Sequence, residues 1–217
     1  MPRLLPGTSP ETDLYALTDD ELSLGRPAVE VAKALLDSGI KILQYREKEK
    51  KAGQMLKECL ELRRLTREAG ACFIVNDHVD IAVLCEADGV HVGQSDMAAG
   101  KVRALIGPDK ILGVSAQTVE DALLAEREGA DYLGVGAVFP TGTKTDANAV
   151  SYDTLREICA AVSIPVIAIG GITRDNVARL SGSGIVGVAV VSAIFAQPDI
   201  PAATRALKTA VRTALEL

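Results

Sequence analysis

The sequence predicts a single α/β domain, a (β/α)8 TIM barrel, from three observations. Short apolar runs recur along the chain and alternate with amphipathic segments of helical spacing. The runs are apolar throughout, which is typical of parallel strands that are covered on both faces. Eight such strand–helix units fit in the 217 residues, the number that closes a barrel. A doubly wound open sheet is the alternative, but the glycine-rich dinucleotide loop that usually follows its first strand is missing from this sequence.

The first half of the chain contains four of these units, after a flexible arm expected over residues 1–11. The barrel domain is then expected over residues 12–217. Gly39 and Gly70 follow apolar residues at helical spacing and are expected to end the first two helices. Residues 49–51 are expected to form the solvated entry to the second helix. The predicted strands of this half are residues 14–18, 40–45, 72–75 and 89–92.

The second half repeats the pattern and closes with a helix. Thr118 and Asp121 have the spacing of a capping box, which predicts the start of the helix after the fifth strand. A short helix is expected to begin near Thr173, and Leu207 and Val211 mark the closing helix. The predicted strands of this half are residues 111–114, 132–138, 164–169 and 185–191.

The composition argues against several classes of protein. The net charge is −6 and no Lys/Arg-rich block with interleaved aromatic residues occurs, so we expect no nucleic-acid partner. No apolar run approaches the roughly 18 residues of a membrane span, and the first residues lack the apolar segment of a signal peptide. We therefore expect no membrane contact and a cytoplasmic location. The cysteines are widely spaced and form no metal or redox motif: Cys59, Cys72, Cys85 and Cys159.

Polar residues gather at the ends of the predicted strands. In a parallel barrel the carboxyl ends of all strands meet on one face, where substrates bind, so we expect these groups to converge. They are Gln44, Arg46, Lys48, Asn76, Asp77, Gln94, Asp96, Ser115, residues 141–144, Gly170, Gly171 and Ser192.

The chemistry of this set indicates a site for phosphorylated ligands and a metal ion. Asp77 and Asp96 are carboxylates on adjacent loops, and together with phosphate oxygens and water they would suit Mg²⁺. Arg46, Lys48 and Lys144 are cations that could hold a di- or triphosphate. A second anion position is expected at the loops after the last two strands, where such barrels often bind phosphate at the N-terminus of a short helix.

Several of these residues also have a purely structural interpretation. Asp77 and Asp96 could each be only the N-cap of the helix that follows, and so could Ser192. Ser115 could be a simple turn residue, because no His or acid lies near it in the sequence to activate it. His91 lies inside a predicted strand, so we interpret it as a core or barrel-lining residue rather than a base.

Seven segments of the chain, in order, resemble the thiamine-phosphate synthase (thiamine-phosphate pyrophosphorylase) family. Each is short, but together they extend over nearly the whole chain. They are residues 44–48 (QYREK), 75–80 (VNDHVD), 89–96 (GVHVGQSD), 113–116 (GVSA), 134–144 (GVGAVFPTGTK), 168–172 (AIGGI) and 188–194 (VAVVSAI).

The resemblance implies an enzyme, a transferase of a pyrimidinylmethyl group with the (β/α)8 barrel fold. The family joins hydroxymethylpyrimidine diphosphate to hydroxyethylthiazole phosphate through a dissociative, carbocation-like step, and releases pyrophosphate with thiamine phosphate. By the same resemblance Mg²⁺ would bind Asp77 and Asp96, and the catalytic residues would be Arg46, Ser115 and Lys144. Two small phosphorylated heterocycles would be its partners.

The resemblance also assigns binding residues for each substrate. The pyrimidine diphosphate would contact Gln44, Tyr45, Arg46, Glu47, Lys48, Asn76, Ser115 and Lys144. The thiazole phosphate would contact Thr141, Gly142, Thr143, Gly171, Val191 and Ser192.

The chain departs from the family pattern at two positions. Gly142 stands where relatives often have serine, and Gln117 stands where many have histidine. Two alternatives stay open. One is a thiazole tautomerase, which shares the fold but uses a histidine in the region of Gln117 that this chain does not supply. The other is a non-catalytic phosphate-sensing barrel. The pair Asp77 and Asp96, with Lys144, favours the synthase. The sequence also leaves open a homo-oligomer.

Overall fold

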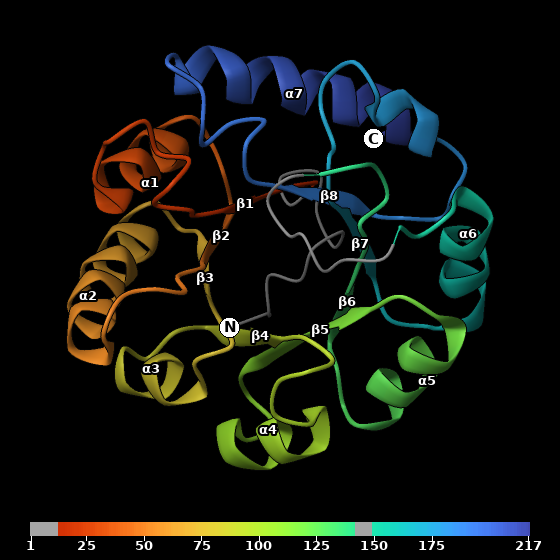
Figure 1. The fold of residues 1–217 in the computed structure, drawn as a ribbon, viewed down its shortest axis with the longest axis horizontal. Helices are drawn as coiled ribbons and strands as arrows, with labels where there is room; N and C mark the ends of the chain where they lie inside the picture. The colour runs from red at the N-terminus through yellow and green to blue at the C-terminus, as the bar shows by residue number, and fades with distance from the viewer. Residues whose placement is uncertain (1–12, 142–148) are drawn as a thin grey trace.

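The chain forms a closed barrel of eight parallel strands in the order β1 to β8, with β1 pairing β8 through Leu14 and Val188. The computed structural model describes residues 13–141 and 149–217. Figure 1 looks down the barrel and shows the strands at the centre, inside a ring of helices. The barrel prediction is therefore confirmed and the open sheet is excluded.

The elements follow the predicted order along the chain. Their bounds are β1 Leu14–Leu17, α1 Ala28–Asp37, β2 Ile42–Tyr45, α2 Ala52–Glu68, β3 Cys72–Asn76, α3 Val79–Leu84, β4 Gly89–Val92, α4 Ala99–Ile106, β5 Ile111–Ala116, α5 Val119–Arg127, β6 Tyr132–Val135, α6 Tyr152–Ala161, β7 Val166–Ile169, the 3₁₀ helix η2 Val177–Leu180, β8 Gly187–Val190 and α7 Ile200–Leu215.

The local signals for helix ends are confirmed. Gly39 and Gly70 follow α1 and α2 with φ of +87° and +60°, the left-handed conformation that glycine adopts without strain. Thr118 and Asp121 form the capping box of α5. Several strands are shorter than their apolar runs. β6 ends at Val135, and Phe139 beyond it is buried in the following loop.

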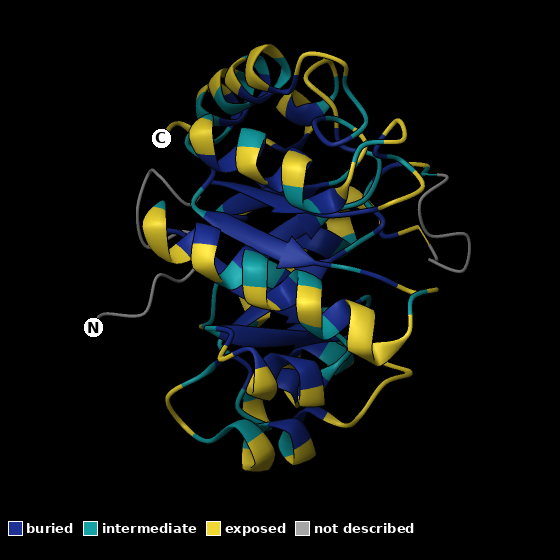
Figure 2. Ribbon diagram, turned by 90° about the vertical axis from the view of Figure 1, so that its left-hand side faces the viewer, coloured by how far each residue is buried: buried dark blue, intermediate teal, exposed yellow. Residues whose placement is uncertain are grey.

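Apolar side chains fill two layers, one inside the barrel and one between the strands and the helices. Figure 2 shows the strands buried and the outer faces of the helices exposed. The layer inside the barrel contains two tyrosines as well as aliphatic residues. Its members are Tyr15, Leu17, Ile42, Cys72, Ile74, Ile111, Tyr132, Ile167 and Ala189.

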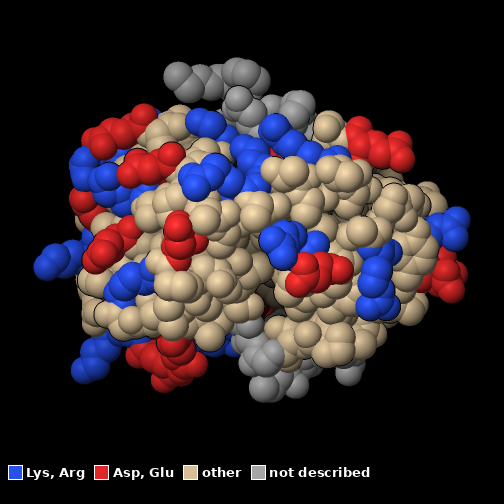
Figure 3. All heavy atoms as spheres, turned by 90° about the horizontal axis from the view of Figure 1, so that it is seen from above, with Lys and Arg blue, Asp and Glu red and all other residues tan. Residues whose placement is uncertain are grey.

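The outer surface carries charges of both signs. Figure 3 shows acidic side chains lying among the basic ones on the face that it displays. This distribution differs from the uniformly basic face of a typical nucleic-acid-binding domain. In the part of the chain that the structure describes, no helix combines the length and the apolar character needed to cross a membrane.

Candidate active site

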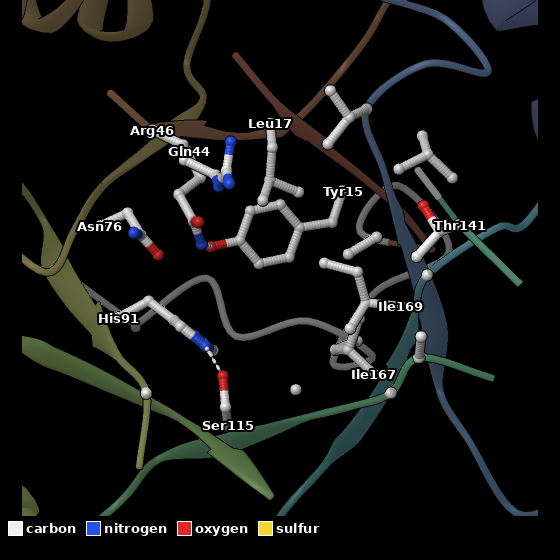
Figure 4. A pocket seen from close by; sticks show the side chains of 18 of the residues that line it. Tyr15, Leu17, Gln44, Arg46, Asn76, His91, Ser115, Thr141, Ile167 and Ile169 are labelled. Atoms are coloured by element: carbon white, nitrogen blue, oxygen red, sulfur yellow. Dashed lines mark hydrogen bonds between the residues drawn. The ribbon is translucent and has the colours of Figure 1, made fainter. Parts of the chain in front are cut away.

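A cavity of about 380 Å³ lies at the carboxyl ends of the strands. Figure 4 shows polar side chains such as Gln44, Asn76 and His91 on one side of it, and the apolar side chains of Ile167 and Ile169 on the other. Strands β2 to β4 thus contribute to the polar side, and β7 to the apolar side. The predicted site residues that line the cavity are Gln44, Arg46, Lys48, Asn76, Asp77, Asp96, Ser115, Thr141, Gly171, Val191 and Ser192.

The loop after β6 is described only in part. Thr141 lines the cavity, but Gly142, Thr143 and Lys144 lie outside the described residues, so their roles remain predictions. Gln117, which stands where many relatives have histidine, also lines the cavity. Its Nε2 donates a hydrogen bond to the carbonyl of Gly136 at 3.3 Å.

Tyr45 does not face the cavity, which corrects the prediction that it binds the ligand. Successive side chains of a strand point to opposite faces, and Gln44 takes the inward position. The Tyr45 hydroxyl donates to Oε2 of Glu58 on α2 at 2.7 Å. Burial, and then the Glu58 carboxylate, raise the pKa of Tyr45 well above its usual value. Tyr45 therefore joins the barrel wall to α2.

Glu47 also lies outside the cavity lining, and its role is to shape the loop after β2. One carboxylate oxygen accepts the backbone N–H groups of Lys48 at 2.7 Å and Glu49 at 2.9 Å. Burial opposes ionisation, but these N–H groups and the Lys50 ammonium together lower the pKa of Glu47. The loop conformation that brings Lys48 to the cavity thus depends on a buried carboxylate.

Lys50 corrects the prediction of a solvated helix entry. Its side chain is only 15% exposed, and its Nζ lies 3.2 Å from Glu47 and 2.8 Å from Glu58. It also pairs with Asp20 of the loop after β1. Lys50 is therefore the cation at the centre of a cluster of carboxylates. The sequence hides this role because the three acids come from different segments.

Arg46 is fixed at the rim of the cavity by the end of β1. Its Nη1 lies 2.8 Å from Oδ2 of Asp19, and its backbone N–H donates to the hydroxyl of Thr18 at 2.9 Å. Asp19 also accepts the N–H of Leu22 at 3.2 Å. Asp19 is not among the predicted site residues, although its place at the end of a predicted strand is a signal for it.

Asp77 and Asp96 both line the cavity, and neither caps a helix. The N-cap residues of α3 and α4 are His78 and Ala98. Asp77 has a φ of +61°, and its backbone N–H donates to the carbonyl of His91 at 2.8 Å. Asp96 accepts the N–H of Gly93 through Oδ2 at 2.7 Å. The interpretation of the two aspartates as simple N-caps is therefore wrong.

The donor set suits a metal ion only if other ligands join it. Among the described residues, no three His, Cys, Asp or Glu side chains gather in a metal-binding arrangement. Mg²⁺ is commonly held by one or two carboxylates together with water and substrate phosphates. Two aspartates beside a cavity lined by cations fit such a site.

Ser115 has a histidine beside it in space, although none lies near it in the sequence. His91 Nε2 lies 3.0 Å from Oγ of Ser115 (Figure 4), and its Nδ1 lies 2.9 Å from the hydroxyl of Tyr132. Gln94 donates to the backbone carbonyl of Ser115 at 2.5 Å. His91 is 9% exposed and lines the cavity, so the interpretation as a barrel-lining residue is confirmed. Its partner Tyr132 is not among the predicted site residues.

A short helix follows β7 as predicted, the 3₁₀ helix η2, and the Val177 N–H at its start donates to the carbonyl of Thr173 at 3.1 Å. Residues 173–176 form a turn before η2, because Asn176 accepts the N–H of Thr173 at 2.8 Å and donates to the carbonyl of Gly171 at 2.8 Å. Ser192 lies in a turn in which the Phe195 N–H donates to the carbonyl of Val191 at 2.8 Å, and the N-cap of α7 is Asp199. A Cβ on Gly171 would lie 2.4 Å from the carbonyl oxygen of Pro140, and its φ is +65°. Glycine thus lets the loop after β7 approach the loop after β6.

Comparison with known proteins gives a consistent result. The model of the thiamine monophosphate synthase family matches residues 14–194. A thiamine-phosphate synthase of Lawsonia intracellularis is 50% identical over 212 residues, covering 97% of this chain and 98% of that protein. The thiamine-phosphate synthase of Chloroflexus aurantiacus is 51% identical over 204 residues, with 94% of each chain covered.

A solved structure shares the fold closely. Thiamine phosphate pyrophosphorylase from Pyrococcus furiosus superposes with a TM-score of 0.87 at 40% identity, covering 94% of this chain and 98% of that one. 3-Hexulose-6-phosphate synthase superposes with a TM-score of 0.65 at 17% identity, a likeness of fold alone. On the family match and these identities, the chain belongs to the thiamine monophosphate synthase family.

Proposed function

We propose that the protein is a thiamine-phosphate synthase, which joins hydroxymethylpyrimidine diphosphate to hydroxyethylthiazole phosphate and releases pyrophosphate. The observation that carries the proposal is the composition of one cavity. It is lined by two cations, Arg46 and Lys48, and by two carboxylates, Asp77 and Asp96, and its opposite side is apolar. Such a cavity can hold a diphosphate with its metal beside the ring of a second substrate.

The pyrimidine diphosphate binds the polar side in this proposal. Arg46 and Lys48 attract the diphosphate, and Asn76 and Ser115 supply uncharged donors from neighbouring strands. Gln44 uses Nε2 to donate to Tyr15 at 2.7 Å, which directs its amide oxygen to accept the amino group of the pyrimidine. Lys144, assigned by the family resemblance, would add a third cation.

The thiazole phosphate binds the apolar side. Ile169 and Val191 can pack against the ring, while Thr141 and Ser192 can donate to the phosphate. The closeness of Gly171 to Pro140 favours backbone contacts here, because no side chain covers the N–H at that position. Gly142 and Thr143 are assigned to the same phosphate by resemblance.

Mg²⁺ is the proposed cofactor, with Asp77 and Asp96 as its protein ligands. When bound, it would neutralise the negative charge that develops on the departing pyrophosphate. The N–H of Gly93 at 2.7 Å from Asp96 Oδ2 fixes one of the two carboxylates. The left-handed backbone of Asp77, at φ +61°, fixes the other where its strand ends.

The proposed reaction breaks one bond and forms one. The C–O bond of the pyrimidinylmethyl diphosphate breaks, pyrophosphate leaves with the electron pair, and the thiazole nitrogen gives its lone pair to the carbon. The step needs no protein nucleophile, and the protein contributes by positioning both rings and by stabilising the leaving group. Arg46, Ser115 and Lys144 are the catalytic residues in this sense.

An assay of pyrophosphate release with both substrates and Mg²⁺ tests the proposal. We expect stoichiometric pyrophosphate and thiamine phosphate, with no release when either substrate is omitted or when Mg²⁺ is chelated. Conversion of one thiazole phosphate isomer into another, without release, would identify a tautomerase instead. Binding without turnover would identify a sensor.

The free state of all four cysteines suits the reducing cytoplasm in which we place the enzyme.

A further inference from the structure

A chain of five hydrogen-bonded side chains runs through the barrel to the cavity. Three of the five have no part in the proposed function. These are Tyr15, Tyr132 and His91. Gln44 Nε2 donates to the Tyr15 hydroxyl at 2.7 Å, and the two tyrosine hydroxyls lie 2.8 Å apart. The hydroxyl of Tyr132 lies 2.9 Å from His91 Nδ1, and His91 Nε2 lies 3.0 Å from Ser115 Oγ. The chain ends at a catalytic residue.

The barrel wall is shaped to admit this chain of side chains. A Cβ on Gly113 of β5 would lie 2.4 Å from the Tyr132 hydroxyl and 2.5 Å from His91 Nδ1. A Cβ on Gly134 of β6 would lie 3.0 Å from His91 Cε1. Any larger residue at Gly113 would therefore separate the tyrosine from the histidine. Glycine at these two strand positions leaves space for the contact.

The two tyrosine hydroxyls are buried, so each of their protons needs an acceptor within the protein. Tyr15 is 2% and Tyr132 is 1% exposed. Burial raises the pKa of both hydroxyls, so each keeps its proton. A buried hydroxyl proton without an acceptor is costly. The arrangement that satisfies every proton is therefore strongly favoured.

Only one of the two possible directions satisfies the Tyr15 proton. Within the described part of the chain, the Tyr15 hydroxyl bonds to Gln44 Nε2, which can only donate, and to the Tyr132 hydroxyl. If the Tyr132 hydroxyl donated to Tyr15 as Gln44 does, neither partner could accept the Tyr15 proton. Tyr15 must therefore donate to Tyr132, and Tyr132 must donate to His91.

We propose that this chain holds His91 as the neutral Nε2–H tautomer, which donates to Ser115 and thereby leaves the Ser115 hydroxyl proton to bind a ligand oxygen. Nδ1 accepts from Tyr132, so the ring proton resides on Nε2. Nε2–H then donates to Ser115 Oγ. The reverse direction would make His91 a base for Ser115, as in enzymes with a serine nucleophile.

The consequence for catalysis rests on the proposed function. A Ser115 hydroxyl that already accepts one hydrogen bond donates its own proton more strongly, because hydrogen bonds in a chain polarise one another. Its acceptor would be a non-bridging oxygen of the departing diphosphate. Tyr132 and His91 are then positioning residues, which act on the substrate only through Ser115.

Nitrogen NMR tests the tautomer directly, without substrate or turnover. The chain contains only two histidines, His78 and His91, so ¹⁵N-histidine labelling gives two ring spin systems. A His78→Gln variant assigns them. We expect the His91 ring at neutral pH to carry its proton on Nε2 and to have an unprotonated, hydrogen-bonded Nδ1. Protonation of Nδ1, in the other tautomer or in the imidazolium, would overturn the proposal.

A double-mutant cycle tests whether the chain acts through Ser115. Tyr132→Phe removes only the hydroxyl that donates to His91, and we expect kcat to fall about tenfold, the value of one hydrogen bond. In a Ser115→Ala background the same change should leave kcat as it was. Equal losses in both backgrounds would refute an action through Ser115. The matched control is Tyr152→Phe, which removes a surface hydroxyl bonded to the Ser181 carbonyl and should have no effect.

The two tests separate this inference from the proposed function. If the wild-type chain released no pyrophosphate, the NMR result would still decide the tautomer. If the enzyme is active but Nδ1 is protonated, only the inference fails. Should Tyr132→Phe not fold, the wild-type spectrum alone gives the decision.

Discussion

The two ends of this barrel use charged side chains in opposite ways. At the amino ends of the strands, carboxylates before β4 and β6 complete their contacts within the protein. Asp88 receives Arg63 through two bonds of 2.7 and 2.8 Å, and Asp131 receives Arg103 at 2.5 Å. Each carboxylate also accepts a backbone N–H of the neighbouring strand at 2.8 Å. At the carboxyl ends, charged groups of similar type line a cavity instead.

The difference separates stability from function. Each of these Arg–Asp pairs joins a helix to two strands, so removing one partner leaves a poorly solvated charge. A charge at the cavity rim keeps capacity for a ligand, and its loss affects the ligand more than the fold. We therefore expect mutations at the amino ends to lower stability and mutations at the carboxyl ends to lower turnover.

The largest effect is expected from Asp77→Asn at the carboxyl end. Asparagine also tolerates the left-handed backbone of this position, at φ +61°, so the change removes charge with little strain. We expect kcat/KM to fall about 100-fold or more, the typical loss for one stabilising group of a transition state. The melting temperature should stay within about 2 °C of wild type, because the loss of a rim charge costs little.

Pyrophosphate release and thermal denaturation measure these two effects side by side. Titration with Mg²⁺ adds a third, since the variant should need more metal for half-maximal activity. Near-normal turnover at wild-type Mg²⁺ would contradict the role of Asp77, and so would outright unfolding.

The matching change at the amino end is Arg103→Met. Arg103 also donates to the carbonyls of Gly107 and Lys110 at 2.8 and 2.7 Å, so its removal leaves several acceptors unsatisfied. We expect a loss of about 2–3 kcal/mol of unfolding free energy, or about 4–12 °C in melting temperature. The kcat of the folded fraction at low temperature should remain normal. A loss of kcat with an unchanged melting curve would reverse the comparison.

Lys50→Met tests a mixed case, an ion cluster that supports the cavity without lining it. The Lys50 ammonium helps to hold the pKa of Glu47 below its usual value, so its stabilising effect is present above the unfolded pKa and is lost as the pH falls. We expect the variant to melt about 4–8 °C lower near neutral pH. The difference from wild type should shrink below about pH 4.5, as the carboxylates become protonated.

Urea denaturation of both proteins across this pH range gives the measurement. A destabilisation that stays constant with pH would show that lost packing of the lysine stem, rather than its charge, is responsible. Glu30→Gln is a suitable control, because it removes an exposed charge from α1.

The smallest effects come from two adjacent residues of β2 that face opposite sides of the barrel wall. Gln44→Met removes a group that lines the cavity and should raise the KM for the pyrimidine diphosphate about tenfold, as one hydrogen bond is lost. Tyr45→Phe removes the bond to Glu58 on the outer side and should cost about 1 kcal/mol of stability with little change in kinetics. Steady-state kinetics on both variants measures these effects. A kinetic defect confined to Tyr45→Phe would indicate that Tyr45 contacts the ligand.

The sequence was sufficient for the fold because the barrel depends on local signals. Apolar runs gave the strands, and Gly39, Gly70 and the Thr118 capping box gave helix ends where the structure has them. The sequence was also sufficient to predict that the polar residues at the strand ends lie together, since the parallel topology brings them to one face. The short helix predicted near Thr173 is the 3₁₀ helix η2, which begins at Val177 after a turn that the Asn176 side chain stabilises.

Pairings between distant strands could not be derived from the sequence. The contact between Ser115 and His91 spans 24 residues and that between His91 and Tyr132 spans 41, so only the barrel register reveals them. The inward or outward direction of Tyr45 depended on the register of β2, which the motif at residues 44–48 did not contain. The carboxylates around Lys50 likewise come from three segments.

A crystal structure of the enzyme with thiamine phosphate, pyrophosphate and Mg²⁺ tests the central claim most directly. We predict that pyrophosphate and the metal lie at the carboxyl ends of β2 to β5, with the metal on Asp77 and Asp96. The thiazole phosphate should lie across the cavity, between Thr141 and Ser192. Phosphates bound at the amino ends of the strands, or the two phosphate groups in exchanged positions, would contradict this account.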